Sequence, residues 1–324
     1  MKKIDLFKVN NYSLTPMTYD HLLHGSVVKE FEQKIASFVG AKYAVALNSA
    51  TSAIFLSMKI LSPDTAIIPS MIPPVVPNAI RNAGCNVIFN INDINWVGGP
   101  YRIKFTGRNE QFRLIDSAQH ISKNQYISSY NSSKDDVAIV YSFYPTKPIG
   151  GIDGGIIVSD NKGFIDKVRM MAYNGMDHSD NSWDREPIDY GWKMYMSSTQ
   201  ADFALRSFYD FKHNIVKLDY IRQLYNKLFR INNYSYHLYR IRVYNNIDFI
   251  KYANKNQITC GIHYKYCHKQ NIYKQPGFST VGTDDNLDET FVSIPFHVGM
   301  NDDQVNYIGD KYYEYMQDKK STKS

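Results

Sequence analysis

The chain has 324 residues, of which 44% are hydrophobic and 21% charged, so a large buried core is expected and wholesale disorder is excluded. Its 37 Lys and Arg residues outnumber its 31 Asp and Glu residues, but they are spread along the chain and do not indicate a nucleic-acid surface. No stretch approaches the roughly 20 apolar residues of a membrane span, and the N-terminus lacks the apolar run of a secretion signal, so a cytoplasmic protein is expected. Three cysteines without CxxC spacing favour reduced thiols and no metal site.

The first part of the chain alternates helical and strand-like patterns. Residues 26–39 carry apolar side chains at helical spacing and end before Gly40, and residues 50–61 and 77–83 are predicted helices. Short apolar runs predict strands over residues 43–47, 66–68, 86–91, 113–116, 137–143 and 155–158. Strands that are apolar on both faces and separated by helices favour an α/β fold with a largely parallel sheet.

The pattern changes in the last third of the chain. A long helix is predicted over residues 197–230, and it is followed by a strand, a helix, a strand and a closing helix over residues 236–243, 248–256, 258–264 and 300–316. We therefore predict a large domain over residues 1–230, joined through the long helix to a small α+β domain over residues 231–324.

Ligands of open α/β sheets bind at the carboxyl ends of the strands, so the residues that follow each predicted strand are the first candidates. The small hydroxylated segment at residues 48–52 leads into a helix, and its amides and hydroxyls would suit a phosphate or an ordinary helix cap. Asp116 closes one strand and would face a ligand or cap a helix. Ser142 closes another strand, and Lys147 follows in a Gly-rich loop that does not fit a nucleotide-binding motif.

Taken together, these residues match the requirements of pyridoxal 5′-phosphate (PLP). A lysine forms the covalent link to this cofactor, a carboxylate pairs with its ring nitrogen, and amides and hydroxyls hold its phosphate. The absence of a GxGxxG motif after the first strand disfavours a dinucleotide.

The same residues lie in segments that resemble the nucleotide-sugar aminotransferases of the DegT/DnrJ type, which are fold-type-I PLP enzymes. Eight segments in the family's order carry the resemblance, from about residue 25 to residue 316: GSVVKEFEQKIASFVGAKYAVALNSATSAIFLSM, IPSMIPPVVPNAIRNAGCNVIFNIND, LIDSAQH, YSFYPTKPIGGIDGGIIVSDN, GWKMYMSSTQADFAL, YHLYRIRV, GIHYKYCHKQ and SIPFHVGM. The resemblance implies a large domain with a mostly parallel mixed sheet flanked by helices, and a smaller C-terminal domain.

The resemblance also implies roles for individual residues. Lys147 would be the residue linked to PLP and the acid and base of the proton shift, Asp116 would pair with the ring nitrogen, and Gln119 would approach the ring hydroxyl. The phosphate would be held by three small residues, which are Ala50, Thr51 and Ser142. Lys193 stands where the family has an Asn that reaches the partner's phosphate, so a homodimer with active sites at the interface is expected.

The chain departs from the family at several of these places. Pro73 stands where an aromatic side chain commonly stacks on the cofactor, so no stacking residue is predicted. Tyr195 stands where the family often has Arg, and Ile115 replaces the usual Glu before Asp116. Tyr264, Lys265 and His268 would touch substrate or form packed aromatic surface.

The implied reaction transfers an amino group from an amino acid, with glutamate expected, to a keto-deoxy-hexose linked to a nucleoside diphosphate. The product would be an amino sugar for a surface polysaccharide such as the O-antigen of lipopolysaccharide. Three alternatives stay open at this stage: a PLP-fold binding or regulatory protein that has lost catalysis, a PLP-dependent sugar dehydratase, and a PLP enzyme of the same fold that acts on an amino acid. Lys147 favours transamination, because dehydratases related to the family have His at this position.

Overall fold

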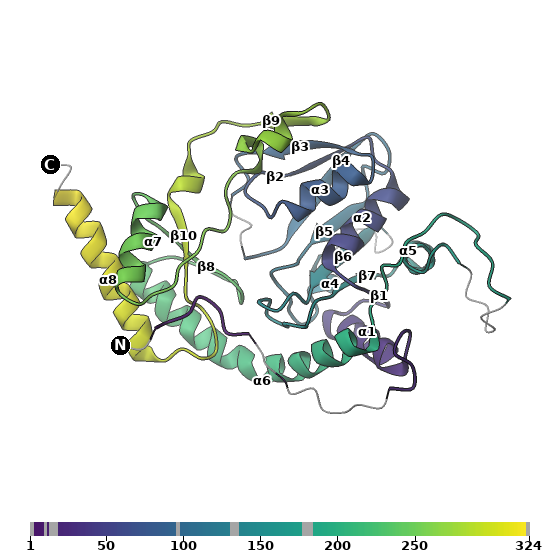
Figure 1. Cartoon of the computed structure of the whole chain (residues 1–324), viewed down its shortest axis with the longest axis horizontal. Coiled ribbons are helices and arrows are strands. Elements are labelled where there is room, and N and C mark those ends of the chain that lie inside the picture. The colour runs from purple at the N-terminus through teal and green to yellow at the C-terminus, as the bar shows by residue number, and fades with distance from the viewer. Residues whose placement is uncertain are drawn as a thin grey trace.

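The computed structural model describes residues 3–9, 12, 19–94, 98–129, 136–176 and 184–321. Most of these residues surround one large sheet, and the remainder form a smaller group of elements at the other end of the long helix α6, Ser198–Phe229 (Figure 1). Within the described ranges, no helix combines the length and the apolar character that crossing a membrane requires.

The large sheet has eight strands in the order β1-β7-β6-β5-β4-β2-β3-β9. Their bounds are β1 Tyr43–Leu47, β2 Thr65–Pro69, β3 Asn86–Asn90, β4 Tyr101–Thr106, β5 Arg113–Asp116, β6 Val137–Ser142, β7 Gly155–Ser159 and β9 Phe278–Val281. Strands β4 and β7 run antiparallel to both of their neighbours, and the other six run in one direction. The predicted mostly parallel, mixed sheet is therefore confirmed.

Helices cover both faces of this sheet because alternate strand residues are apolar on both sides. Ile139 and Tyr141 of β6 belong to a core shared with α1, Ser26–Val39, and with α6. Ala138 and Val140 face the opposite core, which includes residues of three other helices. These helices are α2 Ala50–Leu61, α3 Val75–Asn82 and α5 Lys162–Ala172. A short helix, α4 Gln125–Ser128, follows β5.

The smaller group begins after α6, whose start is fixed by reciprocal hydrogen bonds between Ser197 and Gln200. It consists of β8 Tyr239–Arg242, α7 Asn246–Lys255, β10 Phe291–Ile294 and α8 Asp302–Ser321. Strands β8 and β10 pair antiparallel in a sheet of their own. The N-terminal segment lies against this group, because Ile4 forms backbone hydrogen bonds with Gln257 and Thr259.

Four strands differ from the sequence prediction. The predicted strand over residues 258–264 does not form, because this segment makes only isolated bridges at Ile258 and Gly261. Strands β4, β9 and β10 were not predicted. Strand β9 comes from the C-terminal third of the chain and pairs with β3 of the large sheet. The proposed boundary at residue 230 stays a prediction.

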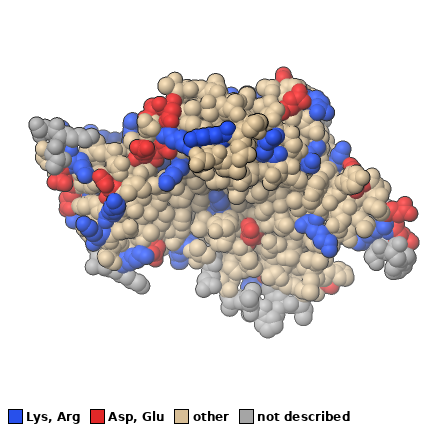
Figure 2. Space-filling view, turned by 45° about the horizontal axis from the view of Figure 1, so that its top comes forward, with Lys and Arg blue, Asp and Glu red and all other residues tan. Residues whose placement is uncertain are grey.

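Charged side chains of both signs lie on the face shown in Figure 2. In Figure 2, Lys and Arg residues are spread over the visible face and interleaved with Asp and Glu.

Candidate active site

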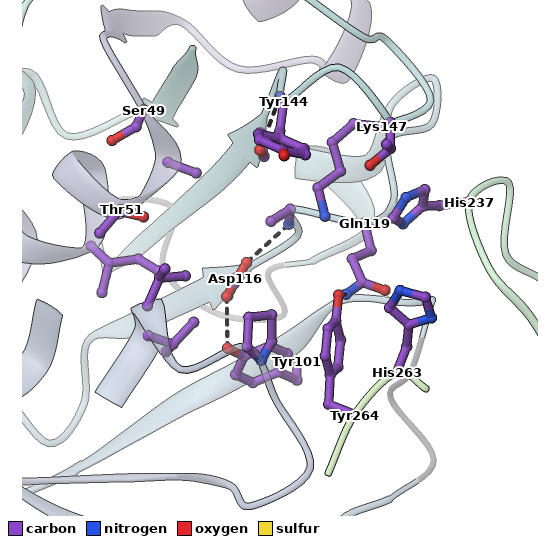
Figure 3. Close-up of a pocket in the computed structure, with 18 of the residues that line it drawn as sticks. Ser49, Thr51, Tyr101, Asp116, Gln119, Tyr144, Lys147, His237, His263 and Tyr264 are labelled. Carbon is purple, nitrogen blue, oxygen red and sulfur yellow. Dashed lines mark hydrogen bonds between the residues drawn. The ribbon is translucent and has the colours of Figure 1, made fainter. Parts of the chain in front are cut away.

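A cavity of about 530 Å³ opens at the carboxyl ends of β5 and β6 and at the start of α2 (Figure 3). Six of the seven residues predicted from the sequence line it: Ala50, Thr51, Asp116, Gln119, Ser142 and Lys147. Lys193 is exposed and is not among the residues that line this cavity. The roles assigned to these residues from the sequence stay predictions.

The start of α2 forms one wall of the cavity. Ser49 caps the helix, since its hydroxyl accepts a hydrogen bond from the amide of Ser52 at 3.1 Å, so the helix-cap interpretation holds for this serine. Ala50 and Thr51 occupy the first two helical positions, where backbone amides lack helical partners and favour an anion. This turn lies directly on Gly155 of β7: a Cβ atom there would stand 2.2 Å from the amide nitrogen of Ala50.

Asp116 lies at the floor of the cavity and is 4% exposed. One carboxylate oxygen, Oδ2, accepts a hydrogen bond from the Tyr101 hydroxyl at 2.6 Å, and Oδ1 accepts one from the Ala118 amide at 2.9 Å. Burial raises the pKa of Asp116, while these hydrogen bonds and the charge of Lys147 act in the opposite direction. The site therefore holds a desolvated carboxylate that is partly stabilised by donors.

Lys147 projects into the same cavity from the loop between β6 and β7 (Figure 3). The loop is tightly folded: the Lys147 amide donates to the Tyr144 carbonyl at 2.9 Å, and the Gly151 amide donates to the Phe143 carbonyl at 2.7 Å. Burial lowers the pKa of Lys147 from its ordinary value to about 8, although the charge of Asp116 raises it. At a pKa of about 8, roughly a tenth of this amine is neutral, and nucleophilic, at pH 7, which is far more than for a lysine of ordinary pKa.

Gln119 is held by two partners at the side of the cavity. Its amide nitrogen donates to the Tyr264 hydroxyl at 2.9 Å, and its amide oxygen accepts from the Gly98 amide at 3.2 Å. Tyr264 also lines the cavity, and it is the member of the uncertain group Tyr264, Lys265 and His268 that reaches it. Pro73 lines the cavity too, at the place where the family commonly has an aromatic ring.

The sequence prediction missed several residues that face Lys147. Phe7, from the N-terminal segment, stacks on His237 with ring centroids 5.2 Å apart and meets the edge of His263. Burial and the charge of Lys147 lower the pKa of both histidines, that of His263 to about 4, so both rings are neutral near pH 7. His237 and His263 lie in segments that the family resemblance covers, but nothing in their spacing marked them as facing the site.

These features fit PLP. The buried Asp116 carboxylate suits a protonated ring nitrogen, and Lys147 supplies an amine of lowered pKa. The start of α2 suits a phosphate, and the close approach to Gly155 fixes the place of its amides.

A comparison with known protein families shows which family the chain resembles. A profile of the DegT/DnrJ/EryC1/StrS aminotransferase family matches residues 10–97 and 114–312, which is most of its length. The chain belongs to this family. The aminotransferase predicted from the sequence is therefore confirmed at the level of the family.

Curated relatives and solved structures agree with this assignment. The chain is 27% identical to the UDP-4-amino-4,6-dideoxy-N-acetyl-beta-L-altrosamine transaminase of Campylobacter jejuni serotype O:2, over 94% of each chain. It is 28% identical to the spore coat polysaccharide biosynthesis protein SpsC of Bacillus subtilis, over 61% of this chain and 58% of SpsC. Helicobacter pylori PseC, an aminotransferase of pseudoaminic acid biosynthesis, shares the fold with a TM-score of 0.77 at 17% identity, over 98% of this chain and 100% of PseC. The PMP form of the putative sugar aminotransferase Spr1654 of Streptococcus pneumoniae shares the fold with a TM-score of 0.78 at 15% identity, over 99% of this chain and 100% of Spr1654.

Proposed function

We propose that this family member uses PLP to transfer an amino group from glutamate to a keto-deoxy-hexose linked to a nucleoside diphosphate. One observation carries the proposal: an amine of lowered pKa, Lys147, and a buried carboxylate, Asp116, share a cavity that begins at a helix N-terminus. This combination stands in a chain of an aminotransferase family.

When bound, PLP supplies a carbonyl for the incoming amine and a ring that accepts electrons. Asp116 would keep the ring nitrogen protonated through its negative charge. The phosphate would lie against the amides and hydroxyls of Ala50, Thr51 and Ser142. Gln119 donates one amide hydrogen to Tyr264, and its second amide hydrogen would be directed to the ring hydroxyl.

Lys147 would act as the base and acid of the reaction. Because its pKa is near 8, its Nζ can accept a proton from the substrate carbon and return one without a large free-energy cost. The neutral rings of His237 and His263 place no positive charge beside it that would lower this pKa further.

The substrate class is supported by the relatives. The Campylobacter jejuni protein aligned over 94% of this chain is named as a transaminase of a UDP-linked amino sugar, and SpsC is named for polysaccharide biosynthesis. We therefore propose a nucleotide-linked keto sugar as the acceptor and an amino sugar for a surface polysaccharide as the product.

The first experiment treats the purified protein with PLP and borohydride and maps the modified residue by mass spectrometry. We expect a reduced adduct on Lys147 in the wild type and none in Lys147→Ala. The loaded protein is then incubated with glutamate and a panel of keto-sugar nucleotides, and a product carrying an amine in place of the ketone is expected.

Other outcomes favour the alternatives. An adduct with no turnover of any sugar would favour a binding or regulatory protein, and loss of a hydroxyl without gain of an amine would favour a dehydratase. Full turnover by Lys147→Ala would refute the proposed mechanism.

We also propose a homodimer in which Lys193 serves the partner's site. Lys193 is exposed on a segment that carries two strongly exposed apolar residues, Ile188 at 64% and Tyr190 at 88%. Exposed apolar side chains of this size favour burial against a second copy. An exposed cation beside them would then be available to the partner's phosphate.

A further inference from the structure

Strand β4 brings a residue into the site from a part of the chain that the family profile does not match. The profile matches residues up to 97 and again from 114, whereas β4 spans Tyr101–Thr106. The strand lies between β2 and β5 and is antiparallel to both. Because of this reversed direction, the first residue of β4, and not its last, lies at the edge of the sheet where the cavity opens.

That first residue is Tyr101, and the sheet register aligns it with Asp116 of β5. Its hydroxyl donates to Oδ2 of Asp116 at 2.6 Å, and the side chain is 7% exposed. Burial and the neighbouring carboxylate raise the pKa of Tyr101 well above its usual value, so the phenol keeps its proton and remains a donor. Figure 3 shows this contact beneath the cavity.

We propose that Tyr101 is a positioning residue for Asp116, which it keeps ionised and fixed in orientation for the cofactor's ring nitrogen. A carboxylate has about four acceptor positions, so the donors Tyr101 and Ala118 leave room for a ring N–H. A buried carboxylate that loses one of its two donors is less well compensated for its desolvation, and its protonated form then becomes more favourable. The inference rests on the proposed function, because it concerns a carboxylate that serves PLP.

The charged and titratable groups near this carboxylate come from several elements. Lys147 faces it from the loop after β6, and Tyr264 faces it from the segment before β9. Cys267 lies near the Tyr101 hydroxyl. The charge of Lys147 and the hydrogen bond from Tyr101 both lower the pKa of Asp116. Among the described residues, Tyr101 is the only one whose side chain donates a hydrogen bond to this carboxylate.

The test is a double-mutant cycle of Tyr101→Phe and Asp116→Asn in the full-length protein, with the dissociation constant of PLP as the readout. Tyr101→Phe removes one oxygen atom and should weaken PLP binding roughly tenfold to a hundredfold, as loss of a hydrogen bond to a charged group does. In the Asp116→Asn background the same change should have less than about a threefold effect, because the charge is gone.

Tyr141→Phe is the matched control. Tyr141 is a buried tyrosine of β6, 1% exposed, and its hydroxyl has no hydrogen-bond partner among the described residues. The Tyr141→Phe variant should bind PLP with the same affinity as the wild type. An effect of Tyr101→Phe that is absent, or equally large with and without Asp116, would overturn the proposal.

Two further measurements separate the possible failures. Free energies of unfolding of the cofactor-free variants test the coupling of Tyr101 and Asp116 without PLP, so they remain informative if the wild type binds no PLP and the proposed function fails. If Tyr101→Phe does not fold, the folding of the double variant Tyr101→Phe/Asp116→Asn tests whether the unpaired Asp116 carboxylate is the cause. The double variant should fold, because no uncompensated carboxylate remains, and its failure would refute the role of Tyr101.

Discussion

The electrostatics of the site depend on two residues that affect each other. Asp116 raises the pKa of Lys147 against the effect of burial, and Lys147 stabilises the charged form of Asp116. The fraction of Lys147 that is a neutral amine therefore depends on the Asp116 carboxylate, which lies at the end of β5, whereas Lys147 lies on the loop between β6 and β7.

Replacing Asp116 by Asn should lower the pKa of Lys147 below its value of about 8, because the charge that stabilises the ammonium is removed. Acylation of Lys147 in the cofactor-free protein, followed by peptide mass mapping over a range of pH, measures this. The midpoint of the labelling curve should move to lower pH in Asp116→Asn. Labelling of the exposed Lys255 in the same samples serves as the internal reference. An unchanged midpoint, or one at higher pH, would show that the two charges are not coupled.

Sequence reasoning found the residues at the ends of regular strands and missed those brought in from elsewhere. Asp116 and Ser142 end clear apolar strands, so their place at the edge of the sheet could be predicted. His237 and Phe7 reach the cavity only through the packing of the C-terminal elements and the N-terminal segment. A single sequence contains no local signal of that packing.

At the scale of elements, the wall of the cavity proposed to bind the phosphate is the start of α2, at Ala50 and Thr51. The position of this phosphate wall depends on how closely α2 approaches β7. Gly155 makes this approach possible, because a side chain there would overlap the backbone of Ser49 and Ala50. The amides at the start of α2 therefore cannot keep their place if β7 begins with any other residue.

Gly155→Ala should lower the free energy of unfolding by about 1–3 kcal/mol, as overpacking of a core does. It should also weaken PLP binding, because the displaced amides no longer converge on the phosphate. Denaturant titration and a PLP titration measure the two effects. Gly163→Ala in α5 is the control, since the nearest atom to its added Cβ is 3.6 Å away. Equal behaviour of the two variants would argue against this account of the phosphate wall.

Two of the strands that the sequence prediction missed, β4 and β9, differ in how clearly the sequence marks them. Strand β4 alternates buried and exposed residues, with Tyr101, Ile103 and Phe105 inward, so a period of two was present in the sequence and was not used. Strand β9 has the sequence FSTV and is mostly exposed. It has no apolar pattern, and only its pairing with β3 makes it a strand.

At the scale of the whole molecule, the proposed dimer makes a prediction about mixtures. A chain with Lys147→Ala and a chain with Lys193→Ala should each be inactive or strongly impaired. If Lys193 serves the partner's site, a mixed dimer contains one site with both lysines. Random exchange at equal concentrations makes half of the dimers mixed, so about a quarter of the wild-type activity should return.

Activity assays after co-refolding, together with light scattering for the mass, test this arrangement. Mixing Lys147→Ala with Asp116→Asn is the matched control, because both residues line the cavity of one chain and no mixed dimer would gain a complete site. Recovery in neither mixture, with dimers present, would place Lys193 outside the partner's site.

The pairing of the N-terminal segment has a consequence for how the protein is made. The backbone of Ile4 bonds to Gln257 and Thr259, and the Leu6 carbonyl accepts a hydrogen bond from Phe296, so Phe7 takes its place on His237 only beside residues from the last quarter of the chain. At about 5–20 residues per second, a ribosome needs on the order of tens of seconds to reach those partners. During that time most of the large sheet can form while the segment around Ile4 and Leu6 lacks these partners. The cavity around Lys147 is therefore closed on this side among the last events of synthesis, by a segment that left the ribosome before the large sheet did.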